Sequence, residues 1–302
     1  MALVHTIKKI NYAGWDDCVY LSNGVCETVV STKVGPRILR YSLVGGPNLF
    51  YLDEYAAGMT EELNLWRMYG GHTFDFSIDG KKILLPENAP VGVRLEASSM
   101  HFDPMPMGST GISKQISIRM CRRGGLEVKE TLINTSDAPI TVVVEASTNV
   151  VPGGVAALPA TSPDCIMTPP EEADLRRTRF GKELCLVSAD NVKGGEFALD
   201  FKADKRWCGY FNRGCLFIIT TPPEESYEGA NIGVAGTPNR MTITTYSNPV
   251  TLAPGESYTH TEVFNIFIEN PIPATEEEAL KGLHNNKYFY EFVKSPVKGL
   301  DY

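Results

Sequence analysis

The chain has 302 residues, of which 43% are hydrophobic and 21% are charged, an ordinary composition for a globular protein. Its 36 acidic and 28 basic residues give a net charge of −8, which disfavours nucleic acid and anionic membranes as partners because both attract positive charge. No apolar run approaches the roughly 18 residues of a membrane-spanning helix. The first twelve residues lack the basic start and apolar core of a secretory signal.

The seven cysteines are scattered along the chain, and no two of them form a C-x-x-C pair. An odd number without such pairing is typical of reduced thiols rather than of a disulfide framework. The sequence therefore predicts a cytoplasmic protein with free cysteines. It gives no indication of the oligomeric state.

Alternating apolar residues and turn signals predict strands along most of the chain. In chain order the expected strands are 29–43 with a break at Gly35-Pro36, 49–52, 74–78, 81–85, 111–119, 126–133, 140–151, 184–188, 196–201, 215–220, 241–246 and 258–268. Helix signals are few. A capping box at Thr275 to Glu278 predicts a helix over 276–283, and short helices are expected from Thr60 and over 171–177. This pattern predicts one all-β domain over residues 1–302, with large antiparallel sheets and a few short peripheral helices.

The segment 66–75 surrounds a Gly-Gly turn with aromatic residues, an arginine and a histidine. Glycines allow close approach of the backbone, aromatic rings can stack on the apolar face of a sugar, and Arg67 and His72 can hydrogen-bond hydroxyl groups. A surface turn with a structural histidine is the alternative. The candidate stacking residues are Trp66, Tyr69 and Trp207, each of which also fits a place in the core.

Two further segments offer carboxylates. Glu87 lies between Pro86 and Pro90 on a stiff loop, so it is either a positioned acid or a solvated turn residue. Alternation along 140–151 places Glu145 and Asn149 on one face, together with a serine. A row of short polar groups suits a surface that binds hydroxyls. The solvent face of an edge strand is the alternative, although the neighbouring valines favour a central strand.

Strong catalytic or cofactor motifs are absent from the sequence. It contains no phosphate-binding glycine loop, no dinucleotide fingerprint and no cysteine or histidine spacing typical of zinc. The five histidines are far apart, so only convergence in the fold would make a metal site. We therefore expect no metal and no cofactor.

In their order along the chain, several motifs resemble those of the galactose mutarotase-like superfamily, which contains the aldose 1-epimerases. The resemblance spans about residues 29–268 and rests on Gly35-Pro36-Arg37-Ile38-Leu39, Gly45-Gly46-Pro47-Asn48, Arg67-x-x-Gly70-Gly71, the stretch 127–139, the stretch 148–154 and the stretch 252–257. It implies a β-supersandwich and a sugar or sugar derivative as the ligand.

The resemblance also implies a mutarotase mechanism, in which an acid protonates the ring oxygen and a base removes the anomeric proton. His72 would be the acid, and Glu145 or Glu87 would be the base. Such a pair must reach one sugar, so we expect His72 and Glu145 to line one pocket within about 5–10 Å of each other.

Arg37 and Arg67 would hold hydroxyl, phosphate or carboxylate groups of the ligand, and Asn149 would complete the binding site. Glu145 occupies the position of a histidine in the family motif, and no carboxylate occurs over 241–246, where a late glutamate is expected. A non-catalytic carbohydrate-binding domain and an isomerase or lyase for an acidic sugar are therefore the alternatives.

Overall fold

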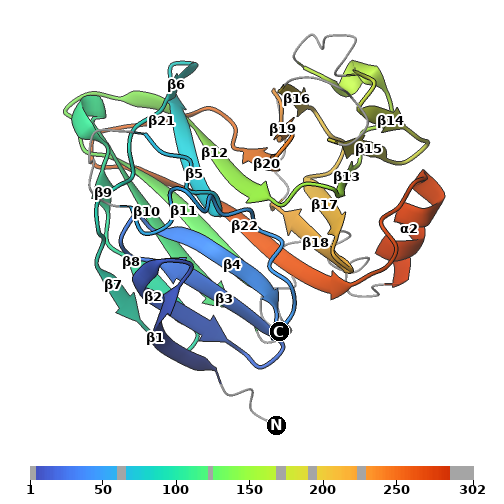
Figure 1. Cartoon of the computed structure of the whole chain (residues 1–302). Coiled ribbons are helices and arrows are strands. Elements are labelled where there is room, and N and C mark those ends of the chain that lie inside the picture. Colours follow the sequence, from blue (N-terminus) through green and yellow to red (C-terminus); the bar gives the residue numbers. More distant parts are fainter. Residues whose placement is uncertain are drawn as a thin grey trace.

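The computed structural model describes residues 5–59, 66–121, 125–167, 175–189, 196–222 and 229–285. Two large antiparallel sheets dominate this part of the chain, and a short α-helix lies at its margin (Figure 1). The predicted all-β class is thereby confirmed. Within the described residues, no helix is long and apolar enough to cross a membrane.

The first sheet has the strand order β1-β2-β3-β4-β5-β12-β20-β19-β16, with β6 beside β5 and β21 beside β12. Its N-terminal half is a meander of neighbouring strands, whereas β12 brings the middle of the chain next to β5. The strands are β1 (Thr6–Tyr12), β2 (Trp15–Ser22), β3 (Cys26–Ser31), β4 (Arg37–Leu43), β5 (His72–Ile78), β6 (Lys81–Ile83), β12 (Ile140–Val150), β16 (Phe197–Phe201), β19 (Ile232–Thr237), β20 (Arg240–Tyr246) and β21 (Val250–Leu252).

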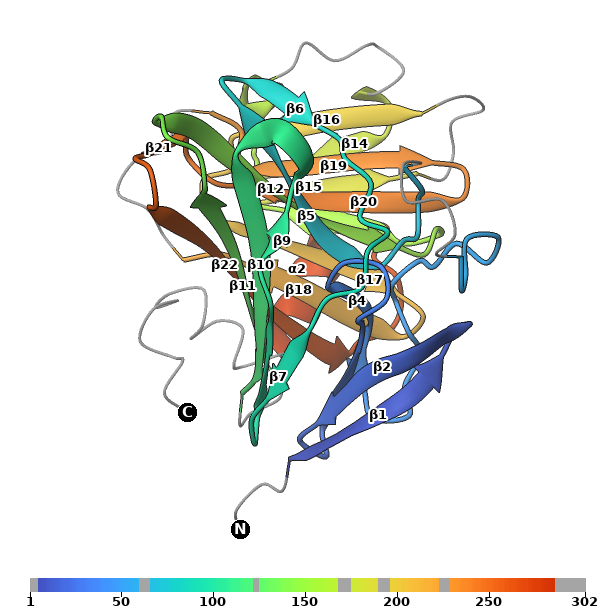
Figure 2. The same ribbon diagram turned by 90° about the vertical axis from the view of Figure 1, so that its left-hand side faces the viewer.

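The second sheet has the order β14-β15-β13-β17-β18-β22-β11-β10-β8-β7, with β9 beside β10. Figure 2 shows β10, β11 and β22 as one layer and β5 and β12 in the layer behind it. The strands are β7 (Val93–Leu95), β8 (Ser99–Phe102), β9 (Met105–Pro106), β10 (Ile112–Met120), β11 (Leu126–Asn134), β13 (Val155–Leu158), β14 (Thr178–Phe180), β15 (Cys185–Ser188), β17 (Trp207–Asn212), β18 (Cys215–Thr220) and β22 (Ser257–Ile268). Short 3-10 turns occur at Gly108–Thr110 and Pro163–Cys165.

The main core lies between the two sheets and draws on both of them. Along β5, Phe74 and Phe76 are fully buried in this core, while Asp75 between them faces the other way. Phe217 and Phe264 of the second sheet pack edge to face, with ring centroids 5.3 Å apart. Each large apolar side chain buried in this way stabilises the fold by about 1.5–3 kcal/mol. Strand alternation therefore fixes which side chains of β5 and β12 face the core.

Helix α2 (Glu276–Asn285) confirms the predicted capping box. The Thr275 hydroxyl accepts a hydrogen bond from the Glu278 backbone N–H, and the Glu278 carboxylate accepts one from the backbone N–H of Thr275. The helix buries Ala279 and Leu283 in a second apolar cluster that also contains Trp207. The helices expected from Thr60 and over 171–177 lie wholly or largely outside the described residues.

Candidate functional site

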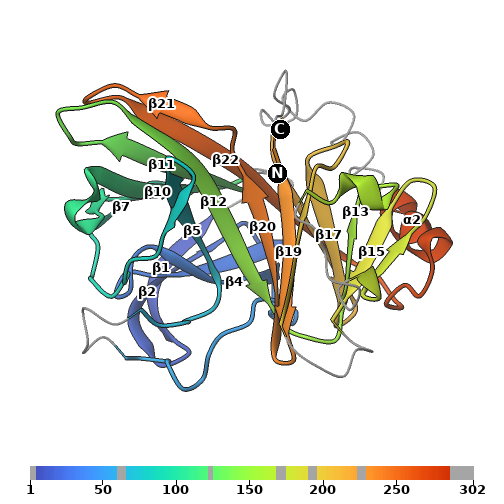
Figure 3. The same ribbon diagram turned by 90° about the horizontal axis from the view of Figure 1, so that it is seen from above.

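A pocket of about 390 Å³ lies on the face of the first sheet that points away from the main core. Its floor crosses five adjacent strands, of which β5, β12, β20 and β19 are seen side by side in Figure 3. The strand register aligns short side chains across this floor. One row contains Thr73, Ser147, Thr244, Gly233 and Asp200, and the next contains Asn149, Thr242, Ala235 and Ala198.

The pocket is hollow because its floor is built from small residues and its rim from large ones. Trp66 and Leu84 line it and are 50% and 54% exposed, so their apolar surfaces are open to a ligand. Tyr246 donates a 2.7 Å hydrogen bond to Asp200, and this contact passes directly over Gly233. A Cβ atom at Gly233 would lie 2.7 Å from the Tyr246 hydroxyl, so the pocket needs glycine at this point.

A buried charge network supports the floor. Arg37 donates from Nη2 to Glu87 Oε2 over 2.9 Å and from Nη1 to the Gly70 carbonyl over 2.8 Å. Thr73 donates to the same oxygen of Glu87, and the fully buried Lys114 of the second sheet donates to the other one. Burial by itself would raise the pKa of Glu87, but the charges of Lys114 and Arg37 outweigh it and hold that pKa below its ordinary value. Glu87 is therefore an ionised anchor with its oxygens occupied.

Asp75 and Glu145 form a second acidic feature, directly opposite each other on β5 and β12. Asp75 lines the pocket, and its carboxyl makes no hydrogen bond or ion pair with the described residues. Burial raises the pKa of Asp75 above its ordinary value, although the charge of Lys114 opposes this rise. Glu145 stands beside it and accepts a 2.6 Å hydrogen bond from Lys82, which also lines the pocket. Asp75 thus lines the pocket without a partner, whereas Glu145 lies just outside the lining residues and is bound by Lys82.

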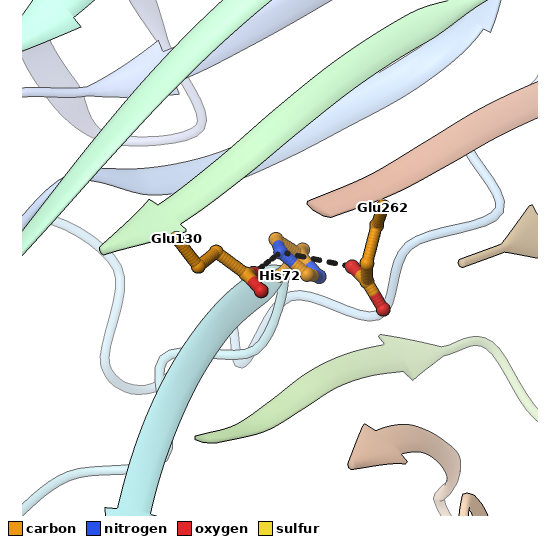
Figure 4. Close-up of side chains that lie close together, drawn as sticks. All are labelled: His72, Glu130 and Glu262. Atoms are coloured by element: carbon orange, nitrogen blue, oxygen red, sulfur yellow. Dashed lines mark hydrogen bonds and ion pairs between the residues drawn. The ribbon is translucent and has the colours of Figure 1, made fainter. Parts of the chain in front are cut away.

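His72 lies on the opposite face of the same strand, inside the main core. It is fully buried, and its ring packs edge to face on Phe264 with centroids 5.0 Å apart. Figure 4 shows Glu130 and Glu262 directed toward the imidazole from two sides. Nε2 of His72 is 2.7 Å from Glu130 Oε1 and 3.6 Å from Glu262 Oε2. Nδ1 is 2.9 Å from the hydroxyl of Thr148.

Burial dominates the electrostatics of this cluster. It lowers the pKa of His72 to about 4, so the contact with Glu130 is a hydrogen bond rather than an ion pair at neutral pH. Burial is the main cause, and the charge of Glu130 the second cause, that raises the pKa of Glu262 to about 8. Burial also raises the pKa of Glu130 well above its ordinary value. Burial thus favours the neutral form of each of the three groups.

The expected convergence of His72 with Glu145 is therefore wrong. His72 pairs in register with Thr148 of β12, and both side chains face the core. Glu145 is three positions before Thr148, so it lies on the opposite face of the sheet beside Asp75, although it is not among the residues that line the pocket. Trp207 also lies elsewhere, buried against helix α2 in the second cluster. A ring held there cannot stack on a ligand in the pocket.

Other residues that the sequence singles out do meet at one pocket. Those that line it are Arg37, Trp66, Arg67, Tyr69, Glu87 and Asn149. Tyr69 is nearly buried under the guanidinium of Arg37, 5.5 Å from ring centroid to Cζ, so it supports the floor. Sequence reasoning missed Asp75, Tyr246 and Asp200. The alternation of 74–78 was the available signal for Asp75, because it puts this residue on the face away from Phe74 and Phe76.

Comparison with known proteins bears on the fold. Neither a protein-family model nor a curated protein matches the sequence. Among solved structures, the chain is similar to a protein from Synechocystis sp. PCC 6803 at 12% identity and a TM-score of 0.59, over 87% of this chain and 100% of that one.

Two further solved structures carry informative names. A galactose mutarotase-like protein from Clostridium acetobutylicum is 10% identical with a TM-score of 0.56, over 87% of this chain and 98% of that one. A galactose 1-epimerase from Lactobacillus acidophilus NCFM is 12% identical with a TM-score of 0.55, over 89% of this chain and 100% of that one. The chain therefore has the fold of the galactose mutarotase-like superfamily, as the order of its sequence motifs implies.

Proposed function

We propose that the pocket binds a neutral sugar and catalyses exchange between its two anomers. The observation that carries this proposal is the register of Asp75 opposite Glu145 on the pocket face. Residues directly opposite each other in antiparallel strands have Cα atoms about 4.5–5.5 Å apart, so both carboxyl groups can reach one sugar ring. The similarity in fold to a galactose 1-epimerase supports the same reaction class.

The charge balance of the pocket favours a neutral ligand over an acidic one. Arg37 is paired with Glu87, and Lys82 is paired with Glu145. The three basic residues that line the pocket, Arg37, Arg67 and Lys82, are matched by three acidic ones, Asp75, Glu87 and Asp200, so the lining has no excess of positive charge for a phosphate or carboxylate. The hydroxyl and amide groups of the floor suit sugar hydroxyls, and the half-exposed ring of Trp66 offers a face for the apolar side of a pyranose. These features argue against the isomerase or lyase alternative for an acidic sugar.

In the proposed mechanism, Asp75 is the general acid and Glu145 is the general base. Glu145 removes the proton of the anomeric hydroxyl while Asp75 donates its proton to the ring oxygen, and the C1–O5 bond breaks. The resulting aldehyde turns over, the ring closes on its other face, and the two protons return. A raised pKa suits Asp75 to the acid role, and the Lys82 ammonium balances the negative charge of Glu145.

The test is NMR exchange spectroscopy with the full chain and a panel of neutral, phosphorylated and acidic sugars. We expect the protein to accelerate anomer exchange of at least one neutral sugar and to leave the acidic sugars at their spontaneous rates. Binding of a neutral sugar without acceleration would replace the proposal by the carbohydrate-binding alternative. Acceleration confined to acidic sugars would contradict the substrate class. The seven scattered cysteines support a cytoplasmic setting for this activity.

A further inference from the structure

Three potential metal ligands converge between the sheets, on the opposite side of the first sheet from the pocket. His72 comes from β5 of the first sheet, and Glu130 and Glu262 come from the adjacent strands β11 and β22 of the second. All three side chains are fully buried, and one ligand atom from each lies within 4.8 Å of the other two. Figure 4 shows both carboxyl groups directed toward the imidazole of His72.

Two carboxylate oxygens in this cluster are left without a hydrogen-bond partner among the described residues, Glu130 Oε2 and Glu262 Oε2. Burying such an oxygen unpartnered costs several kcal/mol, so native structures avoid it or place an ion or water there. Lys114, whose charge acts on Glu130, is itself bound to the carboxylate of Glu87. A cation bound by Glu262 Oε2 and by the carboxylate of Glu130 would compensate for the missing hydrogen bonds.

The distances within the cluster are within a few tenths of an ångström of those around a first-row divalent ion. Metal–nitrogen and metal–oxygen bonds of about 2.0–2.2 Å place neighbouring ligand atoms about 2.9–3.5 Å apart. His72 Nε2 is 2.7 Å from Glu130 Oε1, slightly less than this range, and 3.6 Å from the unpartnered Glu262 Oε2, slightly more. One imidazole nitrogen with two carboxylates is a donor set that suits Zn²⁺ or Mn²⁺, and the two negative charges would balance the ion.

Neighbouring hydroxyl groups hold the ligands in orientation. Thr148 lies 2.9 Å from Nδ1 of His72, and an Nδ1–H donated to this oxygen would leave the lone pair of Nε2 facing the carboxylates. Thr245 donates a 2.6 Å hydrogen bond to Glu262 Oε1, the oxygen that does not face His72. Such outer contacts are typical of protein metal sites.

We propose that His72, Glu130 and Glu262 bind one divalent metal ion, with Zn²⁺ as the best match, and that this ion ties the two sheets together. Because all three ligands are fully buried, the ion would enter as the chain folds rather than through the finished structure. Its role would be structural, since the cluster lies on the opposite side of the first sheet from the pocket. The proposal is independent of the sugar chemistry.

The wild-type chain itself provides the first test. The protein is unfolded in chelator, refolded with or without one equivalent of Zn²⁺, passed through a desalting column and analysed for metal. We expect about one retained Zn²⁺ per chain and a rise of ~5 °C or more in the midpoint of thermal unfolding. Less than about 0.1 equivalent retained, or no change in the midpoint, would overturn the proposal.

Variants locate the ion within the chain. Glu130→Gln and Glu262→Gln keep the side-chain shape but remove a charged ligand, so each should retain at least tenfold less Zn²⁺. The matched control is Glu127→Gln on the same strand, whose carboxylate is bound by Arg119 outside the cluster. Equal zinc content in all three variants would place the ion elsewhere and refute the site. If the two cluster variants fail to fold, X-ray absorption spectroscopy of the zinc-loaded wild type tests the site instead. The proposal requires that the zinc ion has one nitrogen ligand and otherwise oxygen ligands.

Discussion

The carboxylate of Glu87 accepts a 2.9 Å hydrogen bond from Nη2 of Arg37 beneath the floor of the pocket, and both side chains are almost completely buried. Lys114 reaches the same carboxylate from the second sheet. The loop that carries Glu87 is therefore fastened to both sheets by charge. A floor held in this way is rigid before a ligand arrives, which lowers the entropic cost of binding.

Glu87→Gln tests this network. The substitution leaves two buried cations without their anion, so the free energy of unfolding at pH 7 should fall by about 3–5 kcal/mol in urea titrations. The folded pKa of Glu87 is lower than its ordinary value of 4.5, so its stabilising effect is complete above that pH and is lost as the pH falls below it. The difference in the free energy of unfolding between variant and wild type should therefore become smaller as the pH is lowered. Glu96→Gln, at an exposed carboxylate, is the control. Equal stability of Glu87→Gln and wild type at pH 7 would refute the structural role.

Gly233→Ala tests the floor of the pocket. The added methyl group would collide with the hydroxyl of Tyr246 and displace its hydrogen bond to Asp200. We expect the affinity for a neutral sugar, measured by calorimetry, to fall by about tenfold or more. The free energy of unfolding should change by a smaller amount. Gly229→Ala is the matched control, because a Cβ there would meet nothing within 4 Å. Unchanged affinity in Gly233→Ala would exclude this part of the sheet from the binding site.

The cysteines provide a test of burial. All seven are free thiols in the structure, and five of them are buried. Burial raises the pKa of Cys18 and Cys26 to about 11 and that of Cys185 to about 12, which suppresses the reactive thiolate. At neutral pH, iodoacetamide should modify at most two cysteines rapidly in the native protein and all seven after unfolding without reductant. A total of five or fewer after unfolding would reveal a disulfide bond.

Strand alternation contains more information about the site than the motifs do. The alternation of Phe74 and Phe76 extends back by two residues to His72, so the sequence already places this histidine on the core face. The same logic applies to Lys114, which shares the buried face of β10 with Ile116 and Ile118. A motif that pairs a histidine with a glutamate cannot reveal that they face opposite sides of one sheet.

Other features depend on contacts between distant segments, which no local pattern contains. Strand β19 has two glycines in six residues and low strand propensity, and it was not predicted. It pairs with β16 and β20, and its glycines Gly233 and Gly236 leave room for Tyr246 and for the ring of Phe197. Glu130 and Glu262, the partners of His72, are 58 and 190 residues away along the chain, so no local sequence pattern could predict these contacts.

Anomer exchange by the Asp75→Asn variant tests the central claim most directly. Asparagine keeps the shape of the side chain but cannot donate the proton of a carboxylic acid. With a neutral sugar that the wild type accepts, NMR exchange spectroscopy should show a rate at saturation that is lower by roughly 10²–10⁴, while the Kd changes less than about tenfold. An Asp75→Asn variant that exchanges anomers at the wild-type rate would contradict the assignment of Asp75 as the acid, and with it the proposed chemistry of this pocket.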